Sequence, residues 1–210
     1  MQSSSRISTR SIAGGELLYA GPPTLPPLEA VRGTIVFLDW RWLREHAVYE
    51  RYLGELPLEH KDALLAAATS DWVPVDQVLG HYRAMDAIGL SRAQALDVGR
   101  AVGEGAHGPL LRTLVSLAGQ AGANPWFALS QAQKLWDRSW RGGGVLVYRL
   151  GDRAARVEVL KTPVARSRFH RASVAGAIAA GIAGLCRRCG VDDLDALATS
   201  QSFGFRLEWV

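Results

Sequence analysis

The chain has 210 residues, 48% of them hydrophobic and 21% charged, with a formal net charge of +4; this is ordinary globular usage and favours one domain with a tail. Two cysteines are too few for a disulfide framework, and the longest apolar run, Val174 to Cys186, is too short for a membrane span. No signal-like segment is visible at residues 1–10, so we expect a soluble, cytoplasmic protein without a membrane span.

Residues 1–28 are expected to form a disordered or extended tail. They hold a serine run, a Gly-Gly pair and four prolines between Pro22 and Pro27, and they offer little periodic apolar surface. Residues 29–210 are expected to form a single domain.

The globular part opens at residues 31–37, which fit a short strand or the entry to a helix. Apolar residues at helical spacing predict a first helix over residues 38–56, ended by Pro57, and a second over 59–69. A third helix is expected from Pro74, because proline suits a first helical turn.

A capping box is predicted at Ser91 and Gln94, where each side chain can satisfy an orphan amide of the other, and it opens a fourth helix. Glycines at 103, 105 and 108 are expected to interrupt the chain before a fifth helix at Pro109. Asn124-Pro125 is a cap and first-turn pair for an aromatic helix that runs through Trp140.

Alternation then replaces the helical period. Residues 145–150 and 155–160 are predicted strands joined by a turn at Gly151-Asp152. A small-residue helix is expected over 172–189, ended by Gly190. By local propensity residues 192–199 favour a short helix, and residues 203–209 favour a closing strand.

One face of the small-residue helix is nearly smooth, because alanine or glycine recurs every fourth residue from Ala172 to Gly184. Three interpretations stay open: tight packing on the protein's own sheet, a self-association surface, or the wall of a ligand cavity.

Short motifs recur in a fixed order along residues 31–210. They are Val31-Arg32-Gly33, Leu56-Pro57, Trp72-Val73-Pro74, Gly99-Arg100, Leu135-Trp136, Trp140 with the preceding helix and following glycines, and Phe205-Arg206-Leu207-Glu208-Trp209. This order resembles an uncharacterised bacterial family, expanded in myxobacteria, that looks related to the four-vinyl-reductase-type domains, the heme-nitric-oxide-binding domains and the TRAPP subunits.

The resemblance implies an α/β (α+β) fold with an N-terminal helical half and a C-terminal antiparallel sheet carrying the small-residue helix. It also implies that residues 192–199 form a strand, against local propensity. In function it implies a non-catalytic domain that senses a hydrophobic small molecule. The alternative is a TRAPP-like interaction module that acts as a homodimer or with a protein partner.

A heme site needs an axial ligand, usually histidine, in an apolar pocket. None of the five histidines lies in or just before the aromatic helix, and the Tyr-x-Ser-x-Arg clamp of the heme-binding relatives is absent. His46, His60 and His170 are expected in polar surroundings. We therefore expect no cofactor.

The candidate ligand-binding residues are aromatic, because small-molecule pockets are mostly apolar with a few polar anchors. They are Trp126, Phe127, Trp136, Trp140 and Tyr148. The alternative for each residue is an ordinary place in the core. Cys186 and Cys189, at i and i+3 on the expected helix, would share a face and either react together or pack as small core residues. No metal site is expected, since structural zinc needs four ligands.

Residues 138–188 carry eleven Lys/Arg against two acidic residues, a net charge of +9. Arg166, Arg168 and Arg171 could form an anion or partner patch at the start of the small-residue helix, or could neutralise acidic groups of residues 31–137. Nucleic acid is not an expected partner, because no reading motif accompanies the charge. Catalysis is not expected either, since nucleophile–base motifs, a phosphate loop and a dinucleotide fingerprint are missing.

Overall fold

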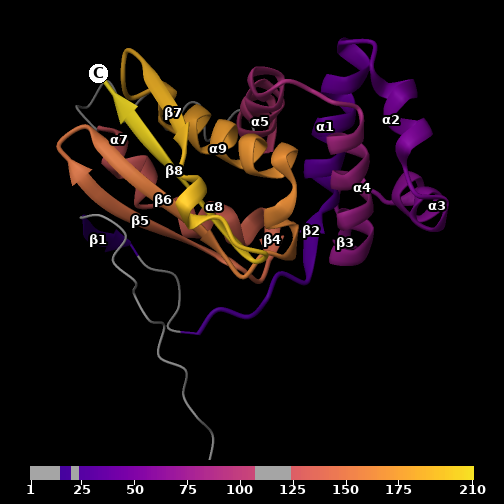
Figure 1. Cartoon of the computed structure of the whole chain (residues 1–210), viewed down its shortest axis with the longest axis horizontal. Coiled ribbons are helices and arrows are strands. Elements are labelled where there is room, and N and C mark those ends of the chain that lie inside the picture. Colours follow the sequence, from indigo (N-terminus) through magenta and orange to yellow (C-terminus); the bar gives the residue numbers. More distant parts are fainter. Residues whose placement is uncertain (1–14, 20–23, 107–123) are drawn as a thin grey trace, which may run out of the picture.

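The computed structural model describes residues 15–19, 24–106 and 124–210. A helical N-terminal half lies beside a C-terminal antiparallel sheet, and one helix of the C-terminal half, α9, lies between the sheet and the helical half (Figure 1). The predicted α/β class is confirmed. Within the described ranges, no helix combines the length and the apolar character needed to cross a bilayer.

The helical half begins with a short strand that runs directly into a helix. Its elements are β2 (Ala30–Arg32), α1 (Gly33–Glu45), α2 (Tyr49–Glu55), α3 (Leu58–Ala66), β3 (Trp72–Pro74), α4 (Val75–Ala87) and α5 (Arg92–Ala106). Residues 31–37 therefore contain both alternatives that the sequence allowed, a strand end and a helix entry. The predicted second, third and fourth helices correspond to α3, α4 and α5.

The prediction of one helix over residues 38–56 is wrong. The chain leaves α1 at His46, and Ala47 takes a left-handed backbone conformation with φ of 56° before α2 begins. An alanine gives no local signal for such a break. Its backbone amide donates to the carbonyl of Arg44, which closes the end of α1.

The predicted capping box is present at the start of α5. The Ser91 amide donates to Gln94 Oε1 at 2.9 Å, and the Gln94 amide donates to Ser91 Oγ at 3.2 Å. The expected interruption at Gly103 and Gly105 is wrong, because α5 continues through both residues to Ala106. The helix predicted from Pro109 lies outside the described residues.

The aromatic segment forms two helices, α7 (Pro125–Leu129) and α8 (Ala132–Ser139), so the prediction of one helix through Trp140 is wrong. The Asn124 cap is confirmed: its side chain accepts the Trp126 amide at 3.1 Å. Ser130 Oγ donates to the Phe127 carbonyl at 2.6 Å, a local bond of the kind that competes with helix continuation.

The main sheet has five antiparallel strands in the order β1-β5-β6-β8-β7. They are β1 (Glu16–Tyr19), β5 (Gly144–Gly151), β6 (Ala154–Leu160), β7 (Cys189–Asp193) and β8 (Ser202–Trp209). The predicted strands at 145–150, 155–160 and 203–209 are confirmed. β1 lies within the segment expected to be a disordered or extended tail, and these four residues are extended and pair with β5.

A second, three-stranded sheet has the order β3-β2-β4 and connects the two halves. Its last strand, β4 (Trp140–Arg141), follows α8 directly and pairs with β2. Because β2 leads into α1 and β4 leads toward β5, this small sheet fixes the helical half against the end of α8.

Helix α9 spans Arg168–Ala183, so the predicted range of 172–189 is wrong at both ends. Ser167 caps it by accepting the His170 amide at 3.0 Å, and the helix ends at Gly184. Residues 192–199 form neither the implied strand nor a full helix. β7 ends at Asp193, and Asp195–Leu197 make one 3₁₀ turn.

The smooth face of α9 packs against α5 rather than against the sheet. A Cβ on Gly176 would lie 2.1 Å from the Leu96 carbonyl oxygen, and a Cβ on Gly99 would lie 1.9 Å from the Ser173 carbonyl oxygen. The two backbones therefore meet directly. Packing is the correct general interpretation of the small residues, but the partner is a helix of the N-terminal half.

Candidate functional site

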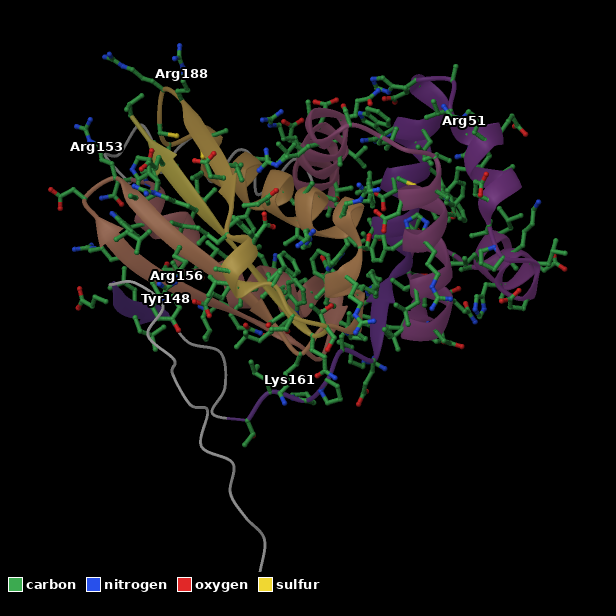
Figure 2. The ribbon with its side chains drawn as sticks, in the orientation of Figure 1. Arg51, Tyr148, Arg153, Arg156, Lys161 and Arg188 are labelled. Atoms are coloured by element: carbon green, nitrogen blue, oxygen red, sulfur yellow. The ribbon has the colours of Figure 1, made fainter. Side chains whose placement is uncertain are left out.

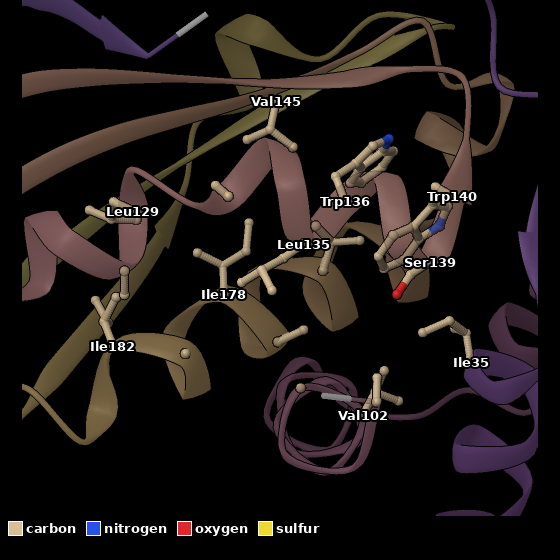
Figure 3. Close-up of a pocket in the computed structure, with 17 residues that line it drawn as sticks. Ile35, Val102, Leu129, Leu135, Trp136, Ser139, Trp140, Val145, Ile178 and Ile182 are labelled. Carbon is tan, nitrogen blue, oxygen red and sulfur yellow. The ribbon is translucent and has the colours of Figure 1, made fainter. Parts of the chain in front are cut away.

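An apolar cavity of about 70 Å³ lies where the helical half meets the C-terminal half (Figure 3). Helices α1, α5, α7, α8 and α9 and strands β4 and β5 contribute to its wall. Representative lining residues are Ile35, Val102, Leu135, Trp140, Val145 and Ile178. The cavity therefore touches elements that lie more than a hundred residues apart in the sequence.

Two stacked tryptophans form part of the wall. The rings of Trp136 and Trp140 lie 4.4 Å apart with an interplanar angle of 14°. Trp136 Nε1 donates to the Gly142 carbonyl at 2.9 Å, which fixes the orientation of its ring. The stack closes one side of the cavity with a rigid apolar surface.

Ser139 provides the hydroxyl group of the otherwise apolar lining. The residue is only 5% exposed, and its hydroxyl has no hydrogen-bond partner among the described residues. Figure 3 shows its oxygen directed away from the tryptophan stack, toward the space beside Ile35 and Val102. A hydroxyl without a protein partner at the cavity wall can form a hydrogen bond with a polar ligand atom.

The structure brings only some of the predicted ligand-binding residues together. Trp136 and Trp140 line the cavity, but Trp126, Phe127 and Tyr148 do not. Trp126 packs edge-on against Trp209, with ring centroids 4.9 Å apart, and Phe127 is 51% exposed.

Tyr148 lies on the face of β5 opposite to Val145 and Val147, since side chains alternate along a strand. The Arg156 guanidinium covers its ring at 4.0 Å, and both side chains are visible in Figure 2. Burial raises the pKa of the Tyr148 phenol.

Sequence reasoning missed the contributions of α1 and α5 to the cavity, because Ile35 and Val102 look like ordinary core residues of amphipathic helices. It also missed Ser139, which differs from a surface helix serine only through its tertiary surroundings. A signal could have been found in its position, directly between the two tryptophans of the stack and one turn from Leu135.

Heme does not fit this cavity. Its volume of about 70 Å³ is small against the roughly 300–1,000 Å³ of drug-sized ligand pockets. The described lining contains no histidine, cysteine, methionine or tyrosine that could bind iron. Among the other histidines, His46 stacks on Trp42 at 3.7 Å, and His170 is fully buried. His107 lies outside the described residues.

His170 was expected in polar surroundings, and that expectation is wrong. Its ring packs against Tyr82 and Phe203, with centroids 4.7 and 5.6 Å away, and neither ring nitrogen has a hydrogen-bond partner. Burial, and to a smaller extent the nearby His81, lower the pKa of His170 to about 3.

A buried polar chain links three residues of the helical half. The Tyr52 hydroxyl and His81 Nδ1 are 2.8 Å apart, and His81 Nε2 and Asp39 Oδ2 are 3.0 Å apart. All three residues are at most 1% exposed. The chain joins α1, α2 and α4 but has no surface at which a substrate could meet it.

The predicted arginine patch is only partly assembled. Arg168 and Arg171 line an open polar cleft of about 410 Å³. The other charged residues of its lining are Arg92, Asp86, Asp193 and Asp195. Arg166 is exposed but is not part of this lining. The cleft mixes both signs of charge.

Acidic groups already lie close to the arginine patch. Asp86 Oδ1 accepts the Phe169 amide at 2.8 Å, so a carboxylate occupies the first turn of α9. Arg171 lies 3.7 Å from Asp195. Neither contact pairs one of the three arginines with an acidic group of residues 31–137, because Asp86 accepts a backbone amide and the partner of Arg171 is Asp195.

Cys186 and Cys189 do not share a helix face, and that prediction is wrong. Cys186 follows the end of α9, and Cys189 begins β7. Burial raises the pKa of both thiols, that of Cys189 to about 11. In the part of the chain that the structure describes, no group of three metal-ligating side chains gathers around them.

Comparison with known proteins finds no matching family model and no matching curated protein. Solved structures do match. One, from "Probing the function of heme distortion in the H-NOX family", is 14% identical with a TM-score of 0.53 and covers 85% of this chain and 94% of its own. Another, from "Modulating Heme Redox Potential Through Protein-Induced Porphyrin Distortion", is 12% identical with a TM-score of 0.50 and the same coverage. At such identities the likeness concerns the fold: this chain is folded like an H-NOX domain.

Proposed function

We propose that residues 29–210 form one non-catalytic regulatory domain whose apolar cavity binds a small ligand without heme. The observation that carries the proposal is the cavity itself, which lies between the helical half and the C-terminal half and is walled by Trp136 and Trp140. The likeness to H-NOX domains supports a sensory role. A ligand that binds between two halves of a domain can also alter how the halves pack.

The cavity is well placed for such coupling. A ligand in it would contact α5 and α9, whose backbones meet at Gly99 and Gly176, and also α8, which leads into the small sheet. A ligand shifts a conformational equilibrium only through different contacts in the two states. Contacts to both halves provide that difference if the halves move relative to each other.

Xenon is a suitable first probe, since the cavity is about 70 Å³ and an engineered apolar cavity of about 150 Å³ takes up xenon or benzene. We expect xenon to shift the methyl resonances of Ile35, Val102 and Ile178 in the full chain. Methyl groups distant from the cavity should be unaffected.

A filling variant makes the test specific. Gly181 lines the cavity, and a Cβ on it would meet nothing within 4 Å, so Gly181→Leu should occupy the space and abolish the xenon shifts. Gly54→Leu is the matched control, because Gly54 is exposed on α2 and equally free of contacts. Absent shifts in the wild type, or equal shifts in wild type and Gly181→Leu, would refute the proposal.

The TRAPP-like interaction module is the alternative function. The observation in its favour is on α3, where Leu58 is 83% exposed and Leu65 is 41% exposed. Seven residues apart, they lie on one side of the helix. Sedimentation equilibrium of the wild type and a Leu58→Ser/Leu65→Ser variant tests this alternative; a monomeric wild type would count against self-association.

A further inference from the structure

A second, polar hollow adjoins the apolar cavity. It has a volume of about 380 Å³, is open to solvent, and is lined by Arg32, Thr34, Thr69, Ser70 and Arg138. Ala106 and Ser139 belong to the lining of both spaces. The two spaces are therefore neighbours. The apolar cavity forms the interior of one composite site, and the second, polar hollow forms its mouth.

Ser139 marks the junction between them. It is the last residue of α8, it is 5% exposed, and its hydroxyl lacks a partner among the described residues although its oxygen faces the cavity (Figure 3). A ligand atom that accepts or donates a hydrogen bond at this point would satisfy the hydroxyl.

The mouth carries positive charge without compensation from its own lining. Its charged side chains are Arg32 and Arg138, and no aspartate or glutamate is among the described lining residues. Arg138 is exposed and forms no ion pair with any described residue. An anionic group placed here would meet two guanidinium groups.

Arg32 is held in place for such contact. One of its terminal nitrogens donates to the Ser70 carbonyl at 2.6 Å, and its guanidinium lies 4.0 Å from the centre of the Trp72 ring. These contacts use one donor and one face of a group that has five N–H donors. The remaining donors are preorganised at the mouth.

We propose that this composite site binds a small amphipathic carboxylate, with its aliphatic tail in the cavity and its carboxylate at the mouth between Arg32 and Arg138. The Ser139 hydroxyl donates a hydrogen bond to a carboxylate oxygen. The cavity of about 70 Å³ limits the tail to a few carbon atoms, so the ligand class is short-chain or branched aliphatic acids. The inference rests on the proposed function, because it names the ligand class of the same cavity.

The test compares an acid with an alcohol of the same length. Pentanoate and 1-pentanol are titrated into the full chain by isothermal calorimetry and by methyl NMR. We expect pentanoate to bind at least tenfold more tightly than 1-pentanol, with shifts at Val102 and Ile178 for both. Acetate, which has no tail for the cavity, should bind more weakly than pentanoate.

Variants at the mouth locate the headgroup. Arg138→Gln should reduce the preference for acid over alcohol to threefold or less. Arg138→Lys keeps the charge but loses the planar guanidinium, so its preference should lie between those of the wild type and Arg138→Gln. Ser139→Ala should weaken pentanoate binding severalfold. Arg153→Gln is the matched control, because Arg153 is an exposed arginine at the β5–β6 turn, remote from the mouth (Figure 2).

Equal affinity for acid and alcohol in the wild type would overturn the inference and leave the proposed function standing. So would an Arg138→Gln variant, shown to be folded by circular dichroism, that keeps the full acid preference. If neither compound binds, the inference is also overturned, and xenon uptake then decides the proposed function separately.

Discussion

Gly99 of α5 lies directly against the backbone carbonyl of Ser173 on α9. A Cβ at Gly99 would be 1.9 Å from that oxygen, a distance that real Cβ atoms do not adopt, and Gly176 makes the reciprocal approach to Leu96. This crossing sets the position of α9 relative to the helical half. Because both helices line the apolar cavity, it also sets the shape of the candidate site.

Gly99→Ala is therefore expected to destabilise the protein by about 2–4 kcal/mol, since the added methyl group forces the two helix backbones apart. Gly181→Ala is the matched control on α9, where an added Cβ meets nothing within 4 Å. It should leave stability unchanged or raise it by up to about 1 kcal/mol, because alanine is the better helix former. Urea unfolding measures both, and similar effects of the two variants would contradict the close crossing.

Acid is expected to destabilise the fold through His170. Burial lowers its pKa from 6.5 to about 3, so between these values the unfolded chain binds a proton that the folded chain does not. The contribution is fully present above pH 6.5 and is lost as the pH falls toward 3, by at most about 1.4 kcal/mol per pH unit.

His170→Leu should make the unfolding free energy less dependent on pH between 6.5 and 4, as measured by urea unfolding at several pH values. His46→Gln, at an exposed histidine, is the control for replacing a histidine outside the core. An unchanged slope in His170→Leu would show that other groups govern acid unfolding.

Cys189 is expected to be a slow nucleophile. Its pKa of about 11 leaves little thiolate near pH 8, and the greater intrinsic reactivity of a basic thiolate offsets only part of this deficit. In a Cys186→Ser background we expect iodoacetamide to label Cys189 about tenfold more slowly than a free thiol. Mass spectrometry across pH 7–10 measures the rate, and labelling at the rate of free cysteine would disprove the buried environment.

Replacing Arg166, Arg168 and Arg171 together with glutamine is expected to change stability by less than about 1 kcal/mol. The ion pair in this group, between Arg171 and Asp195, is 3.7 Å long and Asp195 is 87% exposed, so solvent screens it. Thermal unfolding at low and high salt checks this. A large loss of stability at both salt concentrations would instead give these arginines a structural role.

Local signals in the sequence were enough for several elements. The Ser91–Gln94 capping box, the Asn124 cap, and the alternation of β5 and β6 around the Gly151-Asp152 turn all depend on residues within a few positions of each other. Such features follow from backbone hydrogen bonding and side-chain periodicity, which neighbouring residues decide. The fold class was predicted through the resemblance that the order of motifs along residues 31–210 carries.

Tertiary structure alone decided the rest. The break at Ala47, the end of α9 before Cys186, and the pairing of Gly99 with Ser173 have no local signature, because each depends on a segment far away in the sequence. The sequence drew attention to Trp136 and Trp140, but not to Ser139 between them. Ser139 is buried in the same cavity wall as Ile35 and Val102 and lines the same hollow as Arg32. This arrangement arises only when α1, α5 and α8 converge, because burial and an unpaired hydroxyl are properties of the packed chain.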